Sequence, residues 1–207
     1  YIDYILADAV VIPEGEEHFY AEAVVRLPNS YQINDDRRAI AGNTTRAANA
    51  LPDDAFVFCN FNQGYKLTPA LFDAWARIMN KVPGSVLWLL DSHEAYRINL
   101  GREAEARDIS RQRLVFAPPV DLAQHLARLK LADLFLDSLP YNAHTTASDA
   151  LWAGVPLLTC RGSTFPGRVG ASLLHALGLV DELLVDDVPA FEARAIELAR
   201  DRARLAR

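Results

Sequence analysis

Short apolar runs recur along the chain from residue 55 onward, separated by longer stretches of mixed character. The runs are apolar at nearly every position, which predicts strands that are buried on both faces. Strands of this kind alternating with helices predict an α/β fold with a Rossmann-like parallel sheet. The expected strands are residues 55–61, 85–90, 113–116, 134–136 and 156–160.

The stretches between these strands carry helix signals. The clearest is Thr68 before Pro69, because threonine caps a helix and proline fits its first position. A second helix opens near Thr145 and closes at Gly154. The expected helices are residues 68–80, 92–109, 121–130, 145–154, 165–177 and 189–207.

The first 54 residues are less regular. They predict a strand, a short helix, a second strand and a polar loop, over residues 4–12, 14–26, 30–33 and 34–54. We divide the chain into a first unit of residues 1–40, a linker of residues 41–54 and a domain of residues 55–207. Because the sequence starts with Tyr1, as though within a strand, we expect it to be a piece of a longer polypeptide.

Composition narrows the class of protein. The net charge of −6 argues against a nucleic-acid-binding surface, and no apolar run is long enough to span a membrane. Cys59 and Cys160 lie in apolar runs, which predicts buried thiols in a cytoplasmic protein and no zinc site. Trp75, Trp88 and Trp152 lie within predicted elements and are expected in the core.

The segment after residues 134–137 suits an anion. His144, Thr145 and Thr146 open a helix, where backbone N–H groups lack intrahelical partners and carry partial positive charge. These groups can all donate to phosphate oxygens. Asp149 lies one turn later on the same face and could accept from ribose hydroxyls. A nucleoside diphosphate site is thus predicted, although a threonine cap and a first-turn carboxylate favoured by the dipole remain the simpler alternative.

The connection between the predicted strand at residues 55–61 and the helix at residues 68–80 carries a lysine. Lys66 precedes a helix start, where its charge opposes the helix dipole, so a role against a diphosphate would explain its place. A solvated loop lysine is the alternative. Gln63 and Asn62 either contact a nucleotide or shape the turn. His125 lies on a helix beyond the end of a strand, where ligands bind in parallel sheets, although helical histidines are more often structural.

Four blocks of sequence, residues 58–66, 82–90, 131–137 and 142–156, resemble the protein O-linked N-acetylglucosamine transferases and their bacterial homologues. The resemblance runs, with gaps, from Tyr1 to about Leu184. It implies the C-terminal half of a glycosyltransferase-B fold plus a remnant of the N-terminal half in residues 1–40. It also implies inverting transfer of N-acetylglucosamine from UDP-GlcNAc to serine or threonine hydroxyls of proteins, with no metal and no cofactor.

The resemblance carries over roles for individual residues. Lys66 would neutralise the diphosphate leaving group, with help from Gln63. His144, Thr145 and Thr146 would bind the diphosphate. Asp149 would bind the ribose, and His125 would contact the uridine-sugar region.

The chain also departs from this family. Leu122 stands where animal members carry a uracil-side lysine, and neither the His-Pro motif of the N-terminal half nor the tetratricopeptide repeats occur here. Two alternatives therefore stay open: a GDP-fucose-dependent protein O-fucosyltransferase, against which His144 and Asp149 argue, and a non-catalytic nucleotide-sugar-binding module.

Overall fold

A parallel sheet forms the centre of the molecule in the computed structural model, which describes residues 2–205 apart from the side chain of residue 203. Six strands of the described chain follow the order β5-β4-β3-β6-β7-β8, and every neighbouring pair is parallel. The strands are β3 (Val57–Asn60), β4 (Val86–Leu90), β5 (Leu114–Ala117), β6 (Leu134–Leu136), β7 (Leu157–Cys160) and β8 (Leu184–Val185). The predicted Rossmann-like sheet is confirmed.

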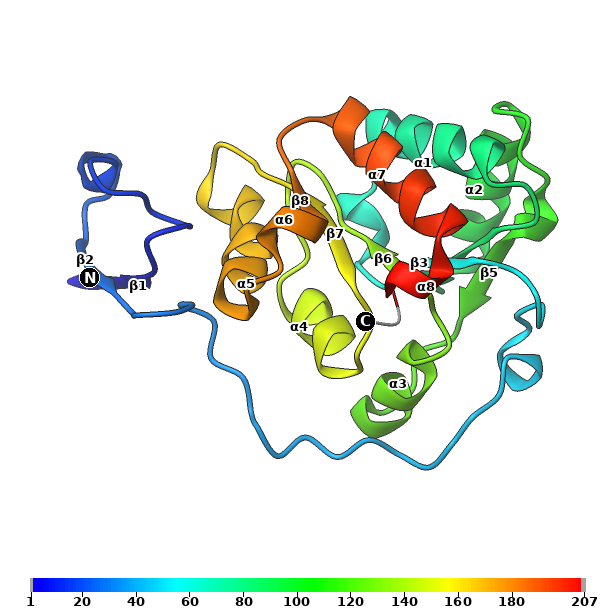
Figure 1. Cartoon of the computed structure of the whole chain (residues 1–207), viewed down its shortest axis with the longest axis horizontal. Coiled ribbons are helices and arrows are strands. Elements are labelled where there is room, and N and C mark those ends of the chain that lie inside the picture. The colour runs from blue at the N-terminus through cyan, green and yellow to red at the C-terminus, as the bar shows by residue number, and fades with distance from the viewer. Residues whose placement is uncertain (1, 206–207) are drawn as a thin grey trace.

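Helices cover both faces of this sheet. Figure 1 shows α1, α2 and α7 above the sheet, and α3 and α4 below it. Thr68 caps α1 by accepting from the backbone N–H of Leu71, as predicted. The bounds are α1 Pro69–Lys81, α2 Glu94–Glu105, α3 Leu122–Leu129, α4 Thr145–Trp152, α5 Val169–Leu177, α6 Val180–Leu183, α7 Val188–Arg200 and α8 Arg202–Leu205. The short elements α6 and β8 were not predicted. No helix of the described chain is long and apolar enough to cross a membrane.

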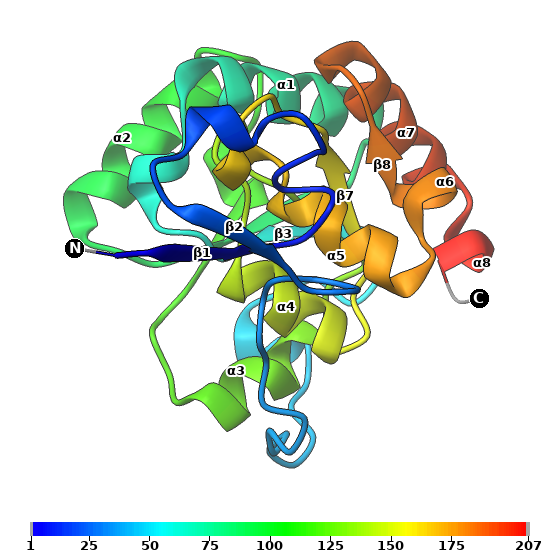
Figure 2. The same cartoon turned by 90° about the vertical axis from the view of Figure 1, so that its left-hand side faces the viewer.

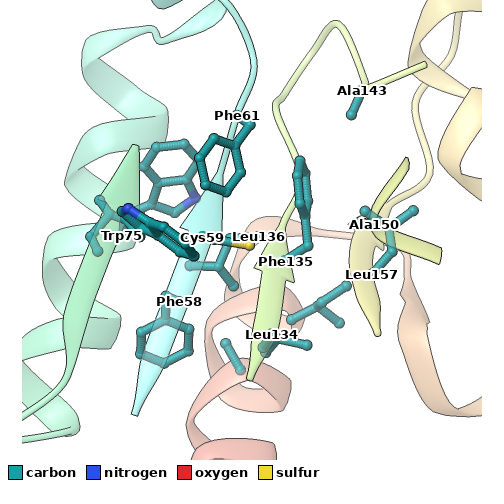
Figure 3. Close-up of a cluster of buried hydrophobic side chains, with 14 of the residues drawn as sticks. Phe58, Cys59, Phe61, Trp75, Leu134, Phe135, Leu136, Ala143, Ala150 and Leu157 are labelled. Carbon is teal, nitrogen blue, oxygen red and sulfur yellow. The ribbon is translucent and has the colours of Figure 1, made fainter. Parts of the chain in front are cut away.

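The core lies between the sheet and its helices. Buried side chains of β3 and β6 line both faces of the sheet, among them Phe58 and Phe135 (Figure 3). Cys59 and Cys160 are buried free thiols, as predicted, and burial raises the pKa of both. Because helices cover both faces of the sheet, its strands must carry apolar residues at consecutive positions.

The N-terminal unit differs from its prediction. Strands β1 (Tyr4–Ala7) and β2 (Ala23–Arg26) pair in parallel as a separate two-stranded sheet, which lies in front of α5 in Figure 2. The helix predicted over residues 14–26 is wrong, because only one turn of 3-10 helix forms there, and so is the strand at residues 30–33. Pro13 and Gly15, whose φ is +89°, start a turn that prevents a continuous helix.

Buried polar contacts fasten this unit to α5. The Asp8 carboxylate is 1% exposed and accepts from the backbone N–H of Tyr31 and from the Ser172 hydroxyl, at 2.8 and 2.6 Å. The chain then runs from the unit beneath α4 and α3 before it enters β3 (Figure 1). The segment of residues 27–46, the connecting segment below, therefore borders both helices. The division at residues 40 and 54 stays a prediction.

Candidate functional site

Two loops meet at the carboxyl ends of the central strands. The loop after β3 is tied to the loop after β6 through Asn62, whose Nδ2 donates to the Ser138 hydroxyl at 2.6 Å. Its Oδ1 accepts from the Thr146 hydroxyl, also at 2.6 Å, so one amide joins both loops to α4. Asn62 is buried, and these contacts fit the turn-shaping alternative considered for it. This edge of the sheet is where parallel sheets bind ligands.

Lys66 reaches across this edge. Its Nζ donates to the carbonyl of Asn142 at 2.8 Å and lies 4.2 Å from the centre of the Tyr141 ring. Partial burial lowers the pKa of Lys66, while the charge of Asp137 opposes that shift. The ammonium group is therefore held against the loop that precedes α4. Lys66 is not a freely solvated lysine in this structure.

The start of α4 carries the three predicted diphosphate ligands. No side chain caps the helix, so the alternative of a threonine cap is not observed. Thr145 is exposed, whereas the hydroxyl of Thr146 is engaged by Asn62. The His144 ring stacks on Tyr141 with centroids 5.0 Å apart, and Tyr141 thus contacts both His144 and Lys66. Burial lowers the pKa of His144, while its hydrogen bond with the Pro166 carbonyl opposes that shift.

Asp149 is in the second turn of α4 and is 5% exposed. Its Oδ1 pairs with Nη1 of Arg38 in the connecting segment at 2.5 Å. Trp152, one turn further, lies with its ring 5.0 Å from the Arg38 guanidinium and is 39% exposed. The expectation that Trp152 belongs to the core is therefore wrong: it covers an ion pair, while Trp75 and Trp88 are buried as predicted.

His125 borders the same edge from α3. Its ring meets the Phe61 ring edge-on at 5.0 Å, and its Nδ1 accepts from Nε of Arg128 at 3.2 Å. Burial and the nearby Arg128 charge lower the pKa of His125 to about 4. Gln63 is exposed in the β3 loop. The other predicted site residues come from the β3 loop and α4, and His125 joins them through Phe61, which precedes Asn62.

The pKa of His125 predicts a pH dependence of folding. The unfolded chain takes up a proton near pH 6.5 and the folded chain only near pH 4, so stability falls as pH drops through this window. We expect His125→Gln to remove about 1–2 kcal/mol of the stability lost between pH 8 and pH 5. Urea denaturation of both proteins at the two pH values measures this. Equal losses in the two proteins would contradict the assigned pKa.

Asp137 is a site residue that sequence reasoning did not single out. Its buried carboxylate accepts from the N–H groups of Ser138 and Ala143 and from the Thr159 hydroxyl, at 2.7, 2.6 and 2.6 Å. Burial raises its pKa to about 6 against these donors. A Cβ on Gly170 would lie 2.7 Å from Oδ2, so only glycine fits there. The signal in the sequence was a lone carboxylate at the end of an apolar strand.

A cavity of about 560 Å³ lies beside this edge. It is bounded by α3, the middle of β4, the end of β5 and residues 41–50, and Arg128 lines it. Leu122, at the start of α3, is 48% exposed. Within the described residues, no three His, Cys, Asp or Glu side chains form a group that could hold a metal ion.

Comparisons with known proteins match this chain throughout. The model of glycosyl transferase family 41 matches residues 39–207. The probable UDP-N-acetylglucosamine--peptide N-acetylglucosaminyltransferase SEC of Arabidopsis thaliana is 35% identical over 99% of this chain, which covers 22% of that protein. The UDP-N-acetylglucosamine--peptide N-acetylglucosaminyltransferase of Caenorhabditis elegans is 36% identical over 93% of the chain and 16% of that protein.

A solved structure of a related transferase is also similar to this chain. A mutant of the O-GlcNAc transferase of Thermobaculum terrenum superimposes with a TM-score of 0.85 and 31% identity, over 99% of this chain and 38% of that one. The chain therefore spans about a fifth of the length of the curated relatives it matches, and about two fifths of the solved one.

Proposed function

Because the chain belongs to glycosyl transferase family 41, we propose that it supplies the donor-binding half of an enzyme that transfers N-acetylglucosamine from UDP-GlcNAc to protein serine or threonine hydroxyls. The fold is the C-terminal half of a glycosyltransferase-B architecture with part of the N-terminal half. The observation that carries the proposal is the position of Lys66, held against the loop that opens α4.

The diphosphate binds between Lys66 and the start of α4 in this proposal. The ammonium group has a carbonyl partner, Asn142, so a phosphate oxygen replaces a neutral acceptor with a charged one. Exposed Thr145 and the N–H groups of the first turn donate to the remaining oxygens, and His144 joins them once its Nε2–H leaves the carbonyl of Pro166. The Thr146 hydroxyl donates to a phosphate oxygen once it leaves Asn62. While it is bonded to Asn62, it holds the loop after β3 against α4.

The reaction is an inverting displacement. The acceptor hydroxyl attacks the anomeric carbon of the sugar as the bond from that carbon to the diphosphate oxygen breaks, and negative charge builds on UDP. Lys66 stabilises that charge more in the transition state than in the bound substrate, which is how a fixed cation accelerates a transfer without a metal ion. The proton of the acceptor hydroxyl passes to a general base as the new bond forms.

The nucleoside lies along α4 and α3. The free carboxylate oxygen of Asp149 accepts from the ribose hydroxyls, while His125 and Gln63 border the uridine-sugar region. Leu122 offers no donor to the base, so the base contacts differ from those of animal members.

The free thiols at Cys59 and Cys160 support a reducing compartment, and we place the protein in the cytoplasm with protein acceptors as its partners.

Calorimetric titration of the chain with UDP, GDP, UDP-GlcNAc and GDP-fucose tests this proposal. We expect micromolar to millimolar binding of UDP and UDP-GlcNAc, and at least tenfold weaker binding of GDP and GDP-fucose. A preference for GDP would assign the protein to fucosyl transfer instead. A folded chain that binds none of the four would contradict the proposed donor site.

A further inference from the structure

The carboxylate of Asp149 is paired with a residue that is distant in the sequence. Arg38 comes from the connecting segment, 111 positions earlier in the chain, and donates to Oδ1. Both side chains are nearly buried, with 8% and 7% exposed. Burial raises the pKa of Asp149, and the guanidinium lowers it. Without Arg38, the carboxylate would be an unpaired buried charge, which proteins avoid by protonation or movement.

Arg38 is itself held in place. Its Nε donates to the carbonyl of Asp35 at 3.2 Å, and its guanidinium lies over the Trp152 ring. Its own carbonyl accepts from Nε1 of Trp152 at 3.3 Å. A planar guanidinium held by stacking and by hydrogen bonds directs its donors along fixed lines. The orientation of Arg38 therefore dictates that of the carboxylate.

The connecting segment follows one face of α4. Upstream of Arg38, Nε2 of Gln32 donates to the Ser148 hydroxyl at 2.8 Å. Ser148, Asp149 and Trp152 lie on the face that begins with Thr145, since these positions are three, four and seven residues after it. The segment therefore borders the helix face proposed to bind the nucleotide.

One carboxylate oxygen stays available on this face. In the described part of the chain no donor bonds Oδ2 of Asp149, and this atom is not among the fully enclosed ones without a partner. The pair thus has a fixed side, Oδ1 against Arg38, and an open side, Oδ2. An ionised carboxylate with one free oxygen is a strong acceptor for a hydroxyl.

We propose that Arg38 is a positioning residue for ribose recognition: it holds Oδ1 of Asp149 so that Oδ2 faces the ribose hydroxyls of the donor nucleotide. This inference rests on the proposed function, in which Asp149 binds the ribose. It assigns part of the selectivity for the nucleotide to the connecting segment, acting through Asp149.

The test compares ribose selectivity in Arg38 variants. Calorimetry gives the affinities of the chain for UDP, for 2′-deoxy-UDP and for inorganic pyrophosphate, the last as a probe of the phosphate site alone. We expect wild-type protein to prefer UDP over 2′-deoxy-UDP about tenfold or more, the range of a hydrogen bond to a charged group. Arg38→Ala should lower this preference below about threefold and leave pyrophosphate binding within about twofold. Arg38→Lys should restore part of the preference.

Two further variants keep the result interpretable. Arg37→Ala is the matched control, because Arg37 is the neighbouring residue and its side chain is 91% exposed, so the preference should not change. If circular dichroism shows that Arg38→Ala does not fold, Arg38→Gln replaces it; this neutral variant can still donate to Asp149 but lacks the stacked, charged guanidinium, so a partial loss of preference is expected.

The outcomes separate the two proposals. A preference for UDP that stays at the wild-type value in Arg38→Ala or Arg38→Gln would overturn the inference and leave the proposed function intact. Equal loss of UDP, 2′-deoxy-UDP and pyrophosphate binding would also overturn it, since Arg38 would then support the site only as a structural element. A folded wild-type chain that binds no UDP would contradict the proposed function itself, and the inference with it.

Discussion

Replacing Lys66 by alanine is expected to abolish most transfer activity while the protein stays folded. Lys66 is half-buried, and its ammonium group faces the loop that opens α4 through the Asn142 carbonyl. If it stabilises the leaving diphosphate, its loss costs about 2–4 kcal/mol of transition-state stabilisation, roughly 30- to 1,000-fold in kcat. The measurement is the rate of radiolabelled N-acetylglucosamine transfer to an acceptor peptide at saturating donor.

Two comparisons make this result specific. Lys81→Ala removes an exposed lysine at the end of α1 and should leave the rate unchanged. Lys66→Arg keeps the charge but places a wider, planar group over Tyr141, so we expect an intermediate rate. Transfer by Lys66→Ala at the wild-type rate would show that another group carries the charge of the leaving diphosphate.

Replacing Asp137 by alanine is expected to give the largest loss of stability among the site residues. Two backbone N–H groups and the Thr159 hydroxyl would lose their common acceptor in a fully buried position. An unsatisfied buried donor costs about 1–3 kcal/mol, so we expect a total of about 3 kcal/mol or more in urea denaturation at pH 8.

The effect should extend to binding. The loop that Asp137 holds includes Tyr141 and Asn142, which contact Lys66, so the affinity for UDP should fall with the stability. Asp137→Asn should be milder, because its amide oxygen still accepts from both backbone N–H groups. Asp36→Ala, at a carboxylate that is 89% exposed, is the control and should change neither quantity. A fully stable Asp137→Ala protein would contradict the role assigned to this carboxylate.

Local signals were enough to predict most of the elements in residues 55–207. Thr68 and Pro69 mark the start of α1 because capping and the fixed φ of proline act within one turn. The runs that became β3 to β7 were recognisable because strands covered on both faces must be apolar throughout. The same reasoning failed at residues 14–26, where pairing of β2 with β1 decides the conformation and a helical pattern does not.

The sequence by itself also identified the candidate anion site, since free N–H groups at the start of α4 and the hydroxyls beside them depend only on neighbours in the chain. The partners of those residues depend on the fold. Asn62 and Thr146 are 84 positions apart, Lys66 and Asn142 are 76 apart, and Arg38 and Asp149 are 111 apart. Hydrogen bonds and ion pairs require contact within a few ångströms, and only the packing of the sheet and the path of the connecting segment bring these residues together.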